Sequence, residues 1–483
     1  DQFATGLVGT RSPYRACRNS LNPDYISGGS SAGSAVAVAL GQVSFALGTD
    51  TAGSGRVPAA FNNIVGLKPS RGLLSTRGVV PACASLDCVT VFANSCDDAN
   101  RVFNVTARFD TEDPWSRRNS YANGPRYFHP AERSFRYAVP SPDQQAFFGD
   151  DVARDAFSQA CEALTAIGGE AVEADFEPLF SAARLLYEGP WVTERYLAVE
   201  ALLKRDPQAL LPVIRDIIEP AADFTARQTF AAQYALQDYR QRAASLLDQV
   251  DVLVTPTAAT CYRIDQVQAD PIALNANLGY YTNFMNLLDL AAVALPTGFL
   301  SDGVGFGITL FHRAFSDKYL LSLAGALQRH LMIPPGCDAD AAFQPEGSVL
   351  TAPVNEATPL VVCGAHMADL PLNWQLTERG GHLLERTQTA PAYRLYALAG
   401  GPPKRPGMVR DVASGTAIEV EVWQLPMSEL GSFVADIPAP LGIGKVQIRD
   451  GRWLPGFICE ASGIADAQDI SEHGGWRTWL AQS

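Results

Sequence analysis

The sequence lacks any uninterrupted apolar run long enough to cross a bilayer, although 47% of its 483 residues are hydrophobic. A membrane-spanning segment is therefore not predicted. It also lacks the charged or repetitive bias of disordered chains, since only 18% of its residues are charged. The apolar fraction is sufficient for large hydrophobic cores, and the length predicts two to four domains.

Metal-binding patterns of cysteine and histidine are also missing. The nine Cys residues are scattered without a C-x-x-C pair, and the six His residues show no metal-ligand spacing. Zinc is therefore not predicted as a ligand. The scattered, odd-numbered cysteines indicate reduced thiols in a cytoplasmic protein.

Positive charge is scarce. The chain has 37 Lys and Arg against 51 Asp and Glu, a net charge of -14, and only five of the basic residues are Lys. Such a field repels phosphate backbones, so nucleic acid is not predicted as a partner. A small anionic substrate would need a local cationic group to overcome the same field.

Helix-like and strand-like segments alternate through residues 1–333, which predicts an α/β domain. The clearest predicted helices are 150–169, 225–249 and 316–331, and the clearest strands are 43–50, 170–175, 250–256 and 291–298. Residues 334–358 are rich in Pro, Ala and acidic residues and are predicted to be a linker. Residues 359–483 form a second, mostly β domain, with strands at 359–367, 392–400, 417–426 and 444–460 and a helix near 464–482.

Two Gly- and Ser-rich loops at 28–34 (GGSSAGS) and 48–56 (GTDTAGSGR) bracket one predicted helix and one predicted strand. Such loops can cradle a phosphate, present a serine nucleophile with N–H groups around it, or be flexible surface loops. A P-loop would need Gly-Lys-Ser/Thr and an α/β-hydrolase would need G-x-S-x-G, and neither is present. Two loops around buried segments favour the serine nucleophile.

The stretch 28–72 resembles the core of the amidase signature family, whose fold is a mixed central sheet covered by helices. In that family a Ser-cisSer-Lys triad hydrolyses amides. The resemblance implies that Ser54 is the nucleophile and that Ser30, preceded by a cis peptide bond, relays the proton. It also implies an oxyanion hole made by the backbone N–H groups of Thr51, Ala52, Gly53 and Ser54.

The lysine of the triad is not found. None of the 29 residues before Ser30 is Lys, and Lys68 stands where the family has a different, structural lysine. We expect that the sequence lacks the N-terminal part of this domain, including its catalytic lysine. The alternative is a lysine-less, non-catalytic scaffold.

Tyr187 and Arg195 are eight residues apart and would share one helical face if the helix continued past Pro190. A phenol and a guanidinium suit a carboxylate, but Arg195 could instead pair with Glu194 or Glu200 on the surface. The segment around them resembles allophanate hydrolases, in which the counterparts of Tyr187 and Arg195 hold the substrate carboxylate. Further segments with the same resemblance are 140–150, 274–296, 361–376, 393–400, 405–409, 440–446 and 474–480.

This resemblance implies hydrolysis of allophanate to ammonia and N-carboxycarbamate, with a C-terminal domain that assists decarboxylation to ammonia and carbon dioxide. No metal or organic cofactor is implied. Another small carboxylated amide, such as malonamate, is the alternative substrate. The expected context is a cytoplasmic homodimer linked to urea carboxylase or to enzymes of cyanuric acid degradation.

The second domain resembles γ-glutamyl cyclotransferase-like folds. His366 is its candidate acid/base, against the alternative of a histidine that merely caps a strand end. Arg394, Lys404 and Arg405 could bind an anionic product there, against the alternative of ordinary surface roles.

Overall fold

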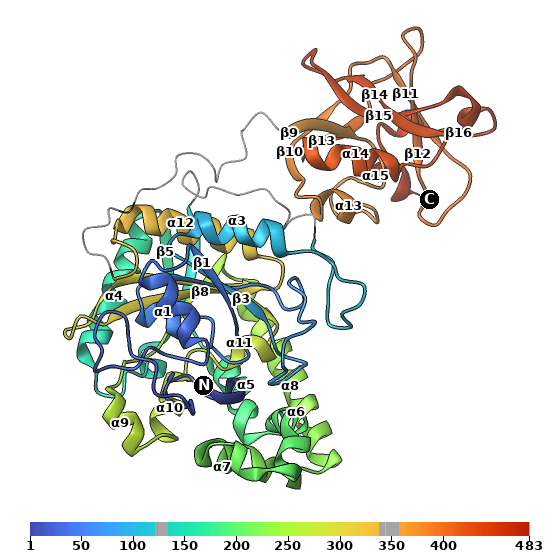
Figure 1. Ribbon diagram of the computed structural model, residues 1–483. Helices are drawn as coiled ribbons and strands as arrows, with labels where there is room; N and C mark the ends of the chain where they lie inside the picture. The colour runs from blue at the N-terminus through green and yellow to red at the C-terminus, as the bar shows by residue number, and fades with distance from the viewer. Residues whose placement is uncertain (121–122, 124–133, 338–342, 344–356, 483) are drawn as a thin grey trace. The chain divides into compact units, whose positions relative to one another are not determined.

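The structure is a computed structural model, which describes residues 1–120, 123, 134–337, 343 and 357–482. The chain divides into two compact units (Figure 1). Across the described residues, no helix has both the length and the apolarity needed to cross a membrane. All nine cysteines are unpaired, as predicted.

The first unit is built on an eight-stranded sheet with strand order β1-β3-β2-β7-β8-β6-β4-β5. β4 pairs in parallel with β5 and β6, and the other neighbours pair antiparallel, so the predicted mixed sheet is confirmed. The strands are β1 (Phe45–Thr49), β2 (Val65–Lys68), β3 (Val89–Ala93), β4 (Phe135–Pro140), β5 (Gly169–Ala174), β6 (Val252–Pro256), β7 (Leu290–Phe299) and β8 (Gly305–Arg313).

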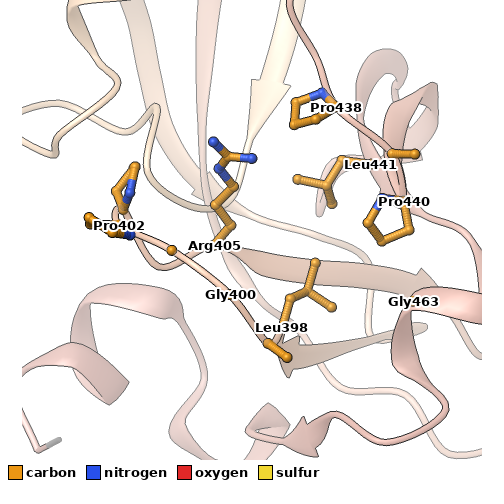
Figure 2. Close-up of a pocket in the computed structure, with 12 residues that line it drawn as sticks. Leu398, Gly400, Pro402, Arg405, Pro438, Pro440, Leu441 and Gly463 are labelled. Atoms are coloured by element: carbon orange, nitrogen blue, oxygen red, sulfur yellow. The ribbon is translucent and has the colours of Figure 1, made fainter.

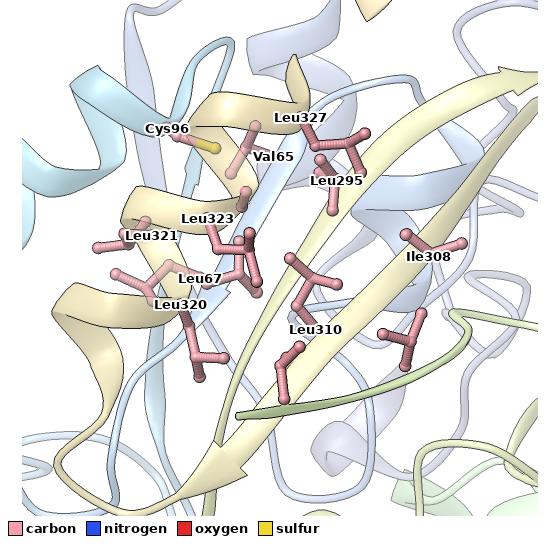
Figure 3. Packing of buried hydrophobic residues seen from close by; sticks show 14 of the residues in the cluster. Val65, Leu67, Cys96, Leu295, Ile308, Leu310, Leu320, Leu321, Leu323 and Leu327 are labelled. Atoms are coloured by element: carbon pink, nitrogen blue, oxygen red, sulfur yellow. The ribbon is translucent and has the colours of Figure 1, made fainter. Parts of the chain in front are cut away.

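Helices cover both faces of this sheet. They are α1 (Ala32–Ala39), α2 (Val57–Phe61), α3 (Cys96–Thr106), α4 (Asp151–Ala166), α5 (Glu177–Glu188), α6 (Val192–Arg205), α7 (Pro212–Ile218), α8 (Ala226–Leu247), α9 (Ile264–Ala269), α10 (Ala273–Leu278), α11 (Phe284–Leu287) and α12 (Asp317–Leu331). Because strand side chains alternate between faces, each central strand supplies two cores. On β6, Val252 and Val254 pack with α3, α4 and α12, whereas Leu253 packs with α5, α8 and α11. Figure 3 shows part of the first core, with leucines of α12 beside Leu295 of β7 and Leu310 of β8.

The predicted helices correspond to α4, α8 and α12, and the predicted strands to β1, β5, β6 and β7. One detail is wrong: β1 is not a buried strand. Phe45 and Leu47 are 47% and 46% exposed, because β1 is the last strand of the sheet and pairs only with β3.

The second unit is mostly β, as predicted. It has a five-stranded sheet of order β10-β13-β9-β15-β14 and a three-stranded sheet of order β12-β11-β16. Its elements are β9 (Ala357–Val362), α13 (Trp374–Thr377), β10 (His382–Gln388), β11 (Tyr393–Ala397), β12 (Pro406–Arg410), β13 (Glu419–Pro426), α14 (Met427–Ala435), β14 (Leu441–Gln447), β15 (Trp453–Cys459), β16 (Gln468–Asp469) and α15 (Trp476–Leu480).

Two predictions for this unit were wrong. The single strand expected at 444–460 is a hairpin of β14 and β15, which turns at Asp450 and Gly451. The long helix expected near 464–482 is reduced to α15, because Gly474 adopts a positive φ of 69° just before it. Most of the predicted linker, at 338–342 and 344–356, lies outside the described residues.

Candidate active site

The two Gly- and Ser-rich loops lie against each other. Ser31 Oγ donates to Thr49 O and accepts from Thr49 N, both at 3.1 Å, which ties the start of α1 to the end of β1. Gly28 lies so close to α2 that a Cβ on it would be 2.8 Å from Pro58 Cα. The peptide bond between Gly29 and Ser30 is cis, which confirms that prediction. The two loops that carry Ser30 and Ser54 are therefore neighbours.

A buried ion pair organises the loop that carries Ser54. Asp50 and Arg56 are both fully buried, with Arg56 Nε 2.8 Å from Asp50 Oδ2 and Arg56 Nη2 2.9 Å from Asp50 Oδ1. Asp50 also accepts the backbone N–H groups of Gly53 at 2.8 Å and Gly55 at 3.1 Å. Burial by itself would raise the pKa of Asp50, but Arg56 and these hydrogen bonds outweigh it and lower the pKa.

These hydrogen bonds show which of the four candidate oxyanion donors are already occupied. The Gly53 N–H already donates to Asp50, so it is not free for a ligand. Within the part of the chain that the structure describes, the N–H groups of Thr51, Ala52 and Ser54 make no hydrogen bond. The geometry therefore favours Thr51, Ala52 and Ser54 over Gly53.

Side chains around the loop hold it in place. Asn286 Nδ2 donates to Asp50 O at 2.7 Å, and Thr51 Oγ1 donates to the Asp87 carboxylate. Gly53 has a φ of +134° and faces Thr282, where a Cβ would be only 2.5 Å from Thr282 Oγ1. This position requires glycine on grounds of both conformation and space.

The five lysines of the chain lie away from Ser30 and Ser54. Lys68 Nζ donates to Leu290 O at 2.6 Å, and Lys204 pairs with Glu200. Lys318 donates to Asn100 and Asn104 between α12 and α3, and Lys404 and Lys445 belong to the second unit. Among the described residues, no lysine makes a hydrogen bond to Ser30 or Ser54.

Tyr187 and Arg195 meet, but not by the predicted route. The helix does not continue past Pro190: α5 ends at Glu188 and α6 begins at Val192. Proline lacks the N–H that a continuous helix would need, and the chain turns there. The turn still brings Arg195 Nη2 to 3.4 Å from the Tyr187 hydroxyl, with the guanidinium 5.6 Å from the centre of the phenol ring.

The surface ion pairs proposed for Arg195 are not formed. The Glu194 carboxylate accepts the backbone N–H of Ser85 at 2.8 Å, and Glu200 pairs with Lys204. Arg195 itself is 2% exposed, and among the described residues it has no carboxylate within 4.0 Å. Because a buried charge without a counterion is costly, this guanidinium is prepared for an anion.

Arg11 is a further buried arginine, and it was not predicted from the sequence. It lines a cavity of about 580 Å³ together with Tyr187, Tyr280 and Asn275. An arginine directly after the apolar and Gly-containing stretch 3–10 (FATGLVGT), with no acidic residue between Asp1 and Asp24, was the signal that could have identified it.

In the second unit, His366 is packed among aromatic rings. Its ring stacks on Phe457 at 4.9 Å and meets the edge of Phe433 at 5.2 Å. His366 Nε2 is 2.8 Å from Gln375 Oε1, so the ring does not cap a strand end. Burial lowers the pKa of His366 to about 4, which keeps the ring neutral at pH 7.

A cavity of about 380 Å³ lies in the same unit, and Arg405 is the charged residue in its wall (Figure 2). Figure 2 shows the Arg405 side chain between the segment of Pro402 and that of Pro438 and Leu441. Of the three basic residues predicted to bind a product, only this one lines the cavity.

The other two have partners elsewhere. Arg394 Nη2 is 2.5 Å from Asp469 Oδ2, and the Lys404 ammonium lies over the Trp479 ring. Among the described residues, no group of three or more His, Cys, Asp and Glu side chains could hold a metal ion.

Comparison with known proteins agrees with this arrangement. Residues 1–321 match the amidase family model, and residues 358–481 match the model of the allophanate hydrolase C-terminal domain. The chain is similar to the solved allophanate hydrolase of Kluyveromyces lactis, with 40% identity, a TM-score of 0.71, and coverage of 100% of this chain and 80% of that one. The predicted resemblances to the amidase signature family and to allophanate hydrolases are thereby confirmed.

Two further relatives differ in how much of their length is matched. A urea amidolyase of Saccharomyces cerevisiae is 42% identical over 494 residues, which cover 99% of this chain but only 27% of that protein. A glutamyl-tRNA(Gln) amidotransferase chain of Legionella pneumophila is 30% identical over 357 residues, covering 68% of this chain and 73% of that protein. The chain thus spans about a quarter of the length of the urea amidolyase.

Proposed function

Because the chain belongs to the amidase family and carries an allophanate hydrolase C-terminal domain, we propose that it is an amidohydrolase that acts on allophanate. The choice of substrate rests on the environment of Arg195. Its buried guanidinium contacts the Tyr187 hydroxyl and has no carboxylate partner among the described residues. Allophanate is a urea with an N-carboxylate, and this pair would hold that carboxylate.

In the proposed reaction, Ser54 Oγ attacks the terminal carbamoyl carbon of allophanate. Its proton passes through Ser30 to the lysine of the family triad, and the backbone N–H groups of Thr51, Ala52 and Ser54 stabilise the oxyanion. Ammonia leaves with a proton, and a carboxycarbamoyl group remains on Ser54 Oγ. Water then releases N-carboxycarbamate and restores the serine.

The ion pair and hydrogen bonds that fix the loop 48–56 support the role of Ser54 as nucleophile. A nucleophile must be held in place before the substrate arrives, because misplacement lowers the rate steeply. The ion pair of Asp50 with Arg56 and the hydrogen bond from Asn286 set the backbone on which Ser54 stands. The Gly53 N–H donates to Asp50 and is therefore omitted from the proposed oxyanion hole.

We further propose that the C-terminal domain, 359–483, assists the decarboxylation of N-carboxycarbamate and that His366 takes part. The supporting observations are the cavity beside Arg405 and a histidine that is neutral at pH 7. The proposed limits of the other parts are 1–333 for the amidase domain and 334–358 for the linker. The likeness to γ-glutamyl cyclotransferase-like folds stays a prediction.

The proposed context is a cytoplasmic homodimer. The similarity to a urea amidolyase supports a functional link to urea carboxylase, and a link to cyanuric acid degradation is the alternative. The alternative substrate is another small carboxylated amide such as malonamate, and the alternative to catalysis is a lysine-less scaffold.

The test is ammonia release from allophanate by the full-length protein and by Ser54→Ala. We expect Ser54→Ala to abolish the release, while the matched Ser34→Ala in the other loop retains it, because Ser34 Oγ only donates to Leu47 O. Activity that persists in Ser54→Ala would refute the assignment. A panel with malonamate and neutral amides decides the substrate.

A further inference from the structure

Arg11 is buried but incompletely satisfied. It is 3% exposed, and its Nη1 donates to Thr5 O at 3.0 Å while Nη2 donates to Pro271 O. Its Nε is buried and, within the described residues, has no hydrogen-bond partner. A guanidinium that donates to two carbonyls and to no carboxylate has no ion-pair partner for its charge.

Thr5 connects Arg11 to the clamp. The Thr5 carbonyl accepts from Arg11 Nη1, and the Thr5 hydroxyl accepts from Arg195 Nη1 at 3.1 Å. Arg195 Nη1 also donates to Ala4 O at 3.0 Å. Arg11 therefore fastens the short segment on which Arg195 rests, and Arg195 in turn reaches Tyr187.

Within the described residues, no carboxylate forms an ion pair with either arginine, although Asp87 and Glu194 are near enough to help raise the pKa of Arg195. The Asp1 carboxylate is close, but its oxygens accept the backbone N–H groups of Val8, Gly9 and Arg11. Glu188 and Asp216 lie in the cavity wall, but both are exposed. Burial lowers the pKa of Arg11 and the nearby charge of Arg195 lowers it further, while Tyr187 acts in the opposite direction.

We propose that Arg11 is a positioning and specificity residue of the carboxylate clamp, a proposal that rests on the proposed function. It holds Arg195 through Thr5, and its charge raises the positive potential beside Tyr187, so that carboxylated amides are selected over neutral ones. The two arginines thus provide the local positive potential that an anionic substrate needs, although the chain as a whole has a net charge of -14.

The experiment uses Arg11→Met, Arg11→Lys and Thr5→Val, with Arg154→Met as the control. Arg154 is a half-exposed arginine that pairs with Asp151 on α4. The KM and kcat for allophanate are measured with the full-length protein. Binding of malonamate and of its neutral amide, malonamide, to the Ser54→Ala protein is measured by calorimetry.

We expect Arg11→Met to raise KM for allophanate by about ten- to hundredfold, the range for a lost hydrogen bond to a charged group, with a smaller change in kcat. Malonamate binding should weaken by a similar factor and malonamide binding should not change. Arg11→Lys should recover part of the loss because it restores the charge, and Thr5→Val should give an intermediate loss. The control should match wild type.

Equal weakening of malonamate and malonamide, or no weakening of either, would overturn the proposal. If allophanate is not a substrate, the calorimetric comparison still decides the role of Arg11. Should Arg11→Met fail to fold, Arg11→Lys and Thr5→Val decide it, since wild-type selectivity in both would contradict the proposal. Failure of the proposed function is thus distinct from failure of this inference.

Discussion

Replacing Asp50 with Asn tests whether the buried ion pair beneath Ser54 holds the first unit together. Asp50 Oδ1 accepts from Gly53 N and Arg56 Nη2, and Oδ2 accepts from Gly55 N and Arg56 Nε. Whichever way an Asn amide is oriented, its NH₂ group would face two donors, so two of the four hydrogen bonds are lost. Arg56 would also keep a fully buried charge without a counterion.

Removing one partner of a buried ion pair costs about 3–5 kcal/mol. We therefore expect Asp50→Asn to lower the free energy of unfolding of the first unit by that amount and to reduce the turnover of allophanate. Hydrogen exchange read by mass spectrometry at increasing urea reports each unit separately. The strands of the second unit serve as an internal control.

The pH dependence has a definite sign. Because the pKa of Asp50 is lowered in the folded state, its stabilisation is complete above the ordinary aspartate pKa near 4 and is lost as the pH falls through the native value. Asp50→Asn should lack this acid-dependent loss. Asp265→Asn, at an exposed pair with Arg263, should leave the unfolding midpoint unchanged. A loss below about 1 kcal/mol, or an equal loss in both units, would refute the reasoning.

Three further predictions concern single positions. Gly53→Ala should abolish turnover and lower the Tm, because the new Cβ would collide with Thr282. The control Gly33→Ala, whose Cβ meets nothing within 4 Å, should raise the Tm slightly. Equal effects of the two variants in a thermal melt would contradict this prediction. The His366 ring should titrate near pH 4 when followed by NMR. The second unit should therefore lose stability as the pH falls from 6.5 toward 4, because in this range the unfolded chain binds the proton and the folded chain does not. An NMR titration midpoint at pH 6.5 would contradict this prediction. Glu421→Gln should destabilise the second unit by about 1–3 kcal/mol in urea, because its buried carboxylate accepts hydrogen bonds from Ala368 N and Trp423 Nε1, whereas its arginine partners are partly exposed. An unchanged midpoint would count against this.

Much of the fold could be predicted from local patterns. The helices 150–169, 225–249 and 316–331 show amphipathic repeats. Their structural counterparts α4 and α8 each bury one side, whereas α12 is buried on nearly all sides. The edge position of β1 could not be predicted, because its sequence is as apolar as that of an inner strand. Strand order depends on pairing between distant segments, which a local pattern does not contain.

The candidate site also has one part that the local sequence predicted and another that required the tertiary structure. The glycines and serines of 28–34 and 48–56 by themselves predicted two tight loops, because small residues permit positive φ and close backbone contact, and they favoured the hypothesis of a serine nucleophile. Only the tertiary structure decided that Gly53 N–H is consumed by Asp50, that Arg195 reaches Tyr187 across a broken helix, and that Arg11 joins it through Thr5. Arg195 and Thr5 are 190 residues apart, so their contact exists only once the chain has closed on itself.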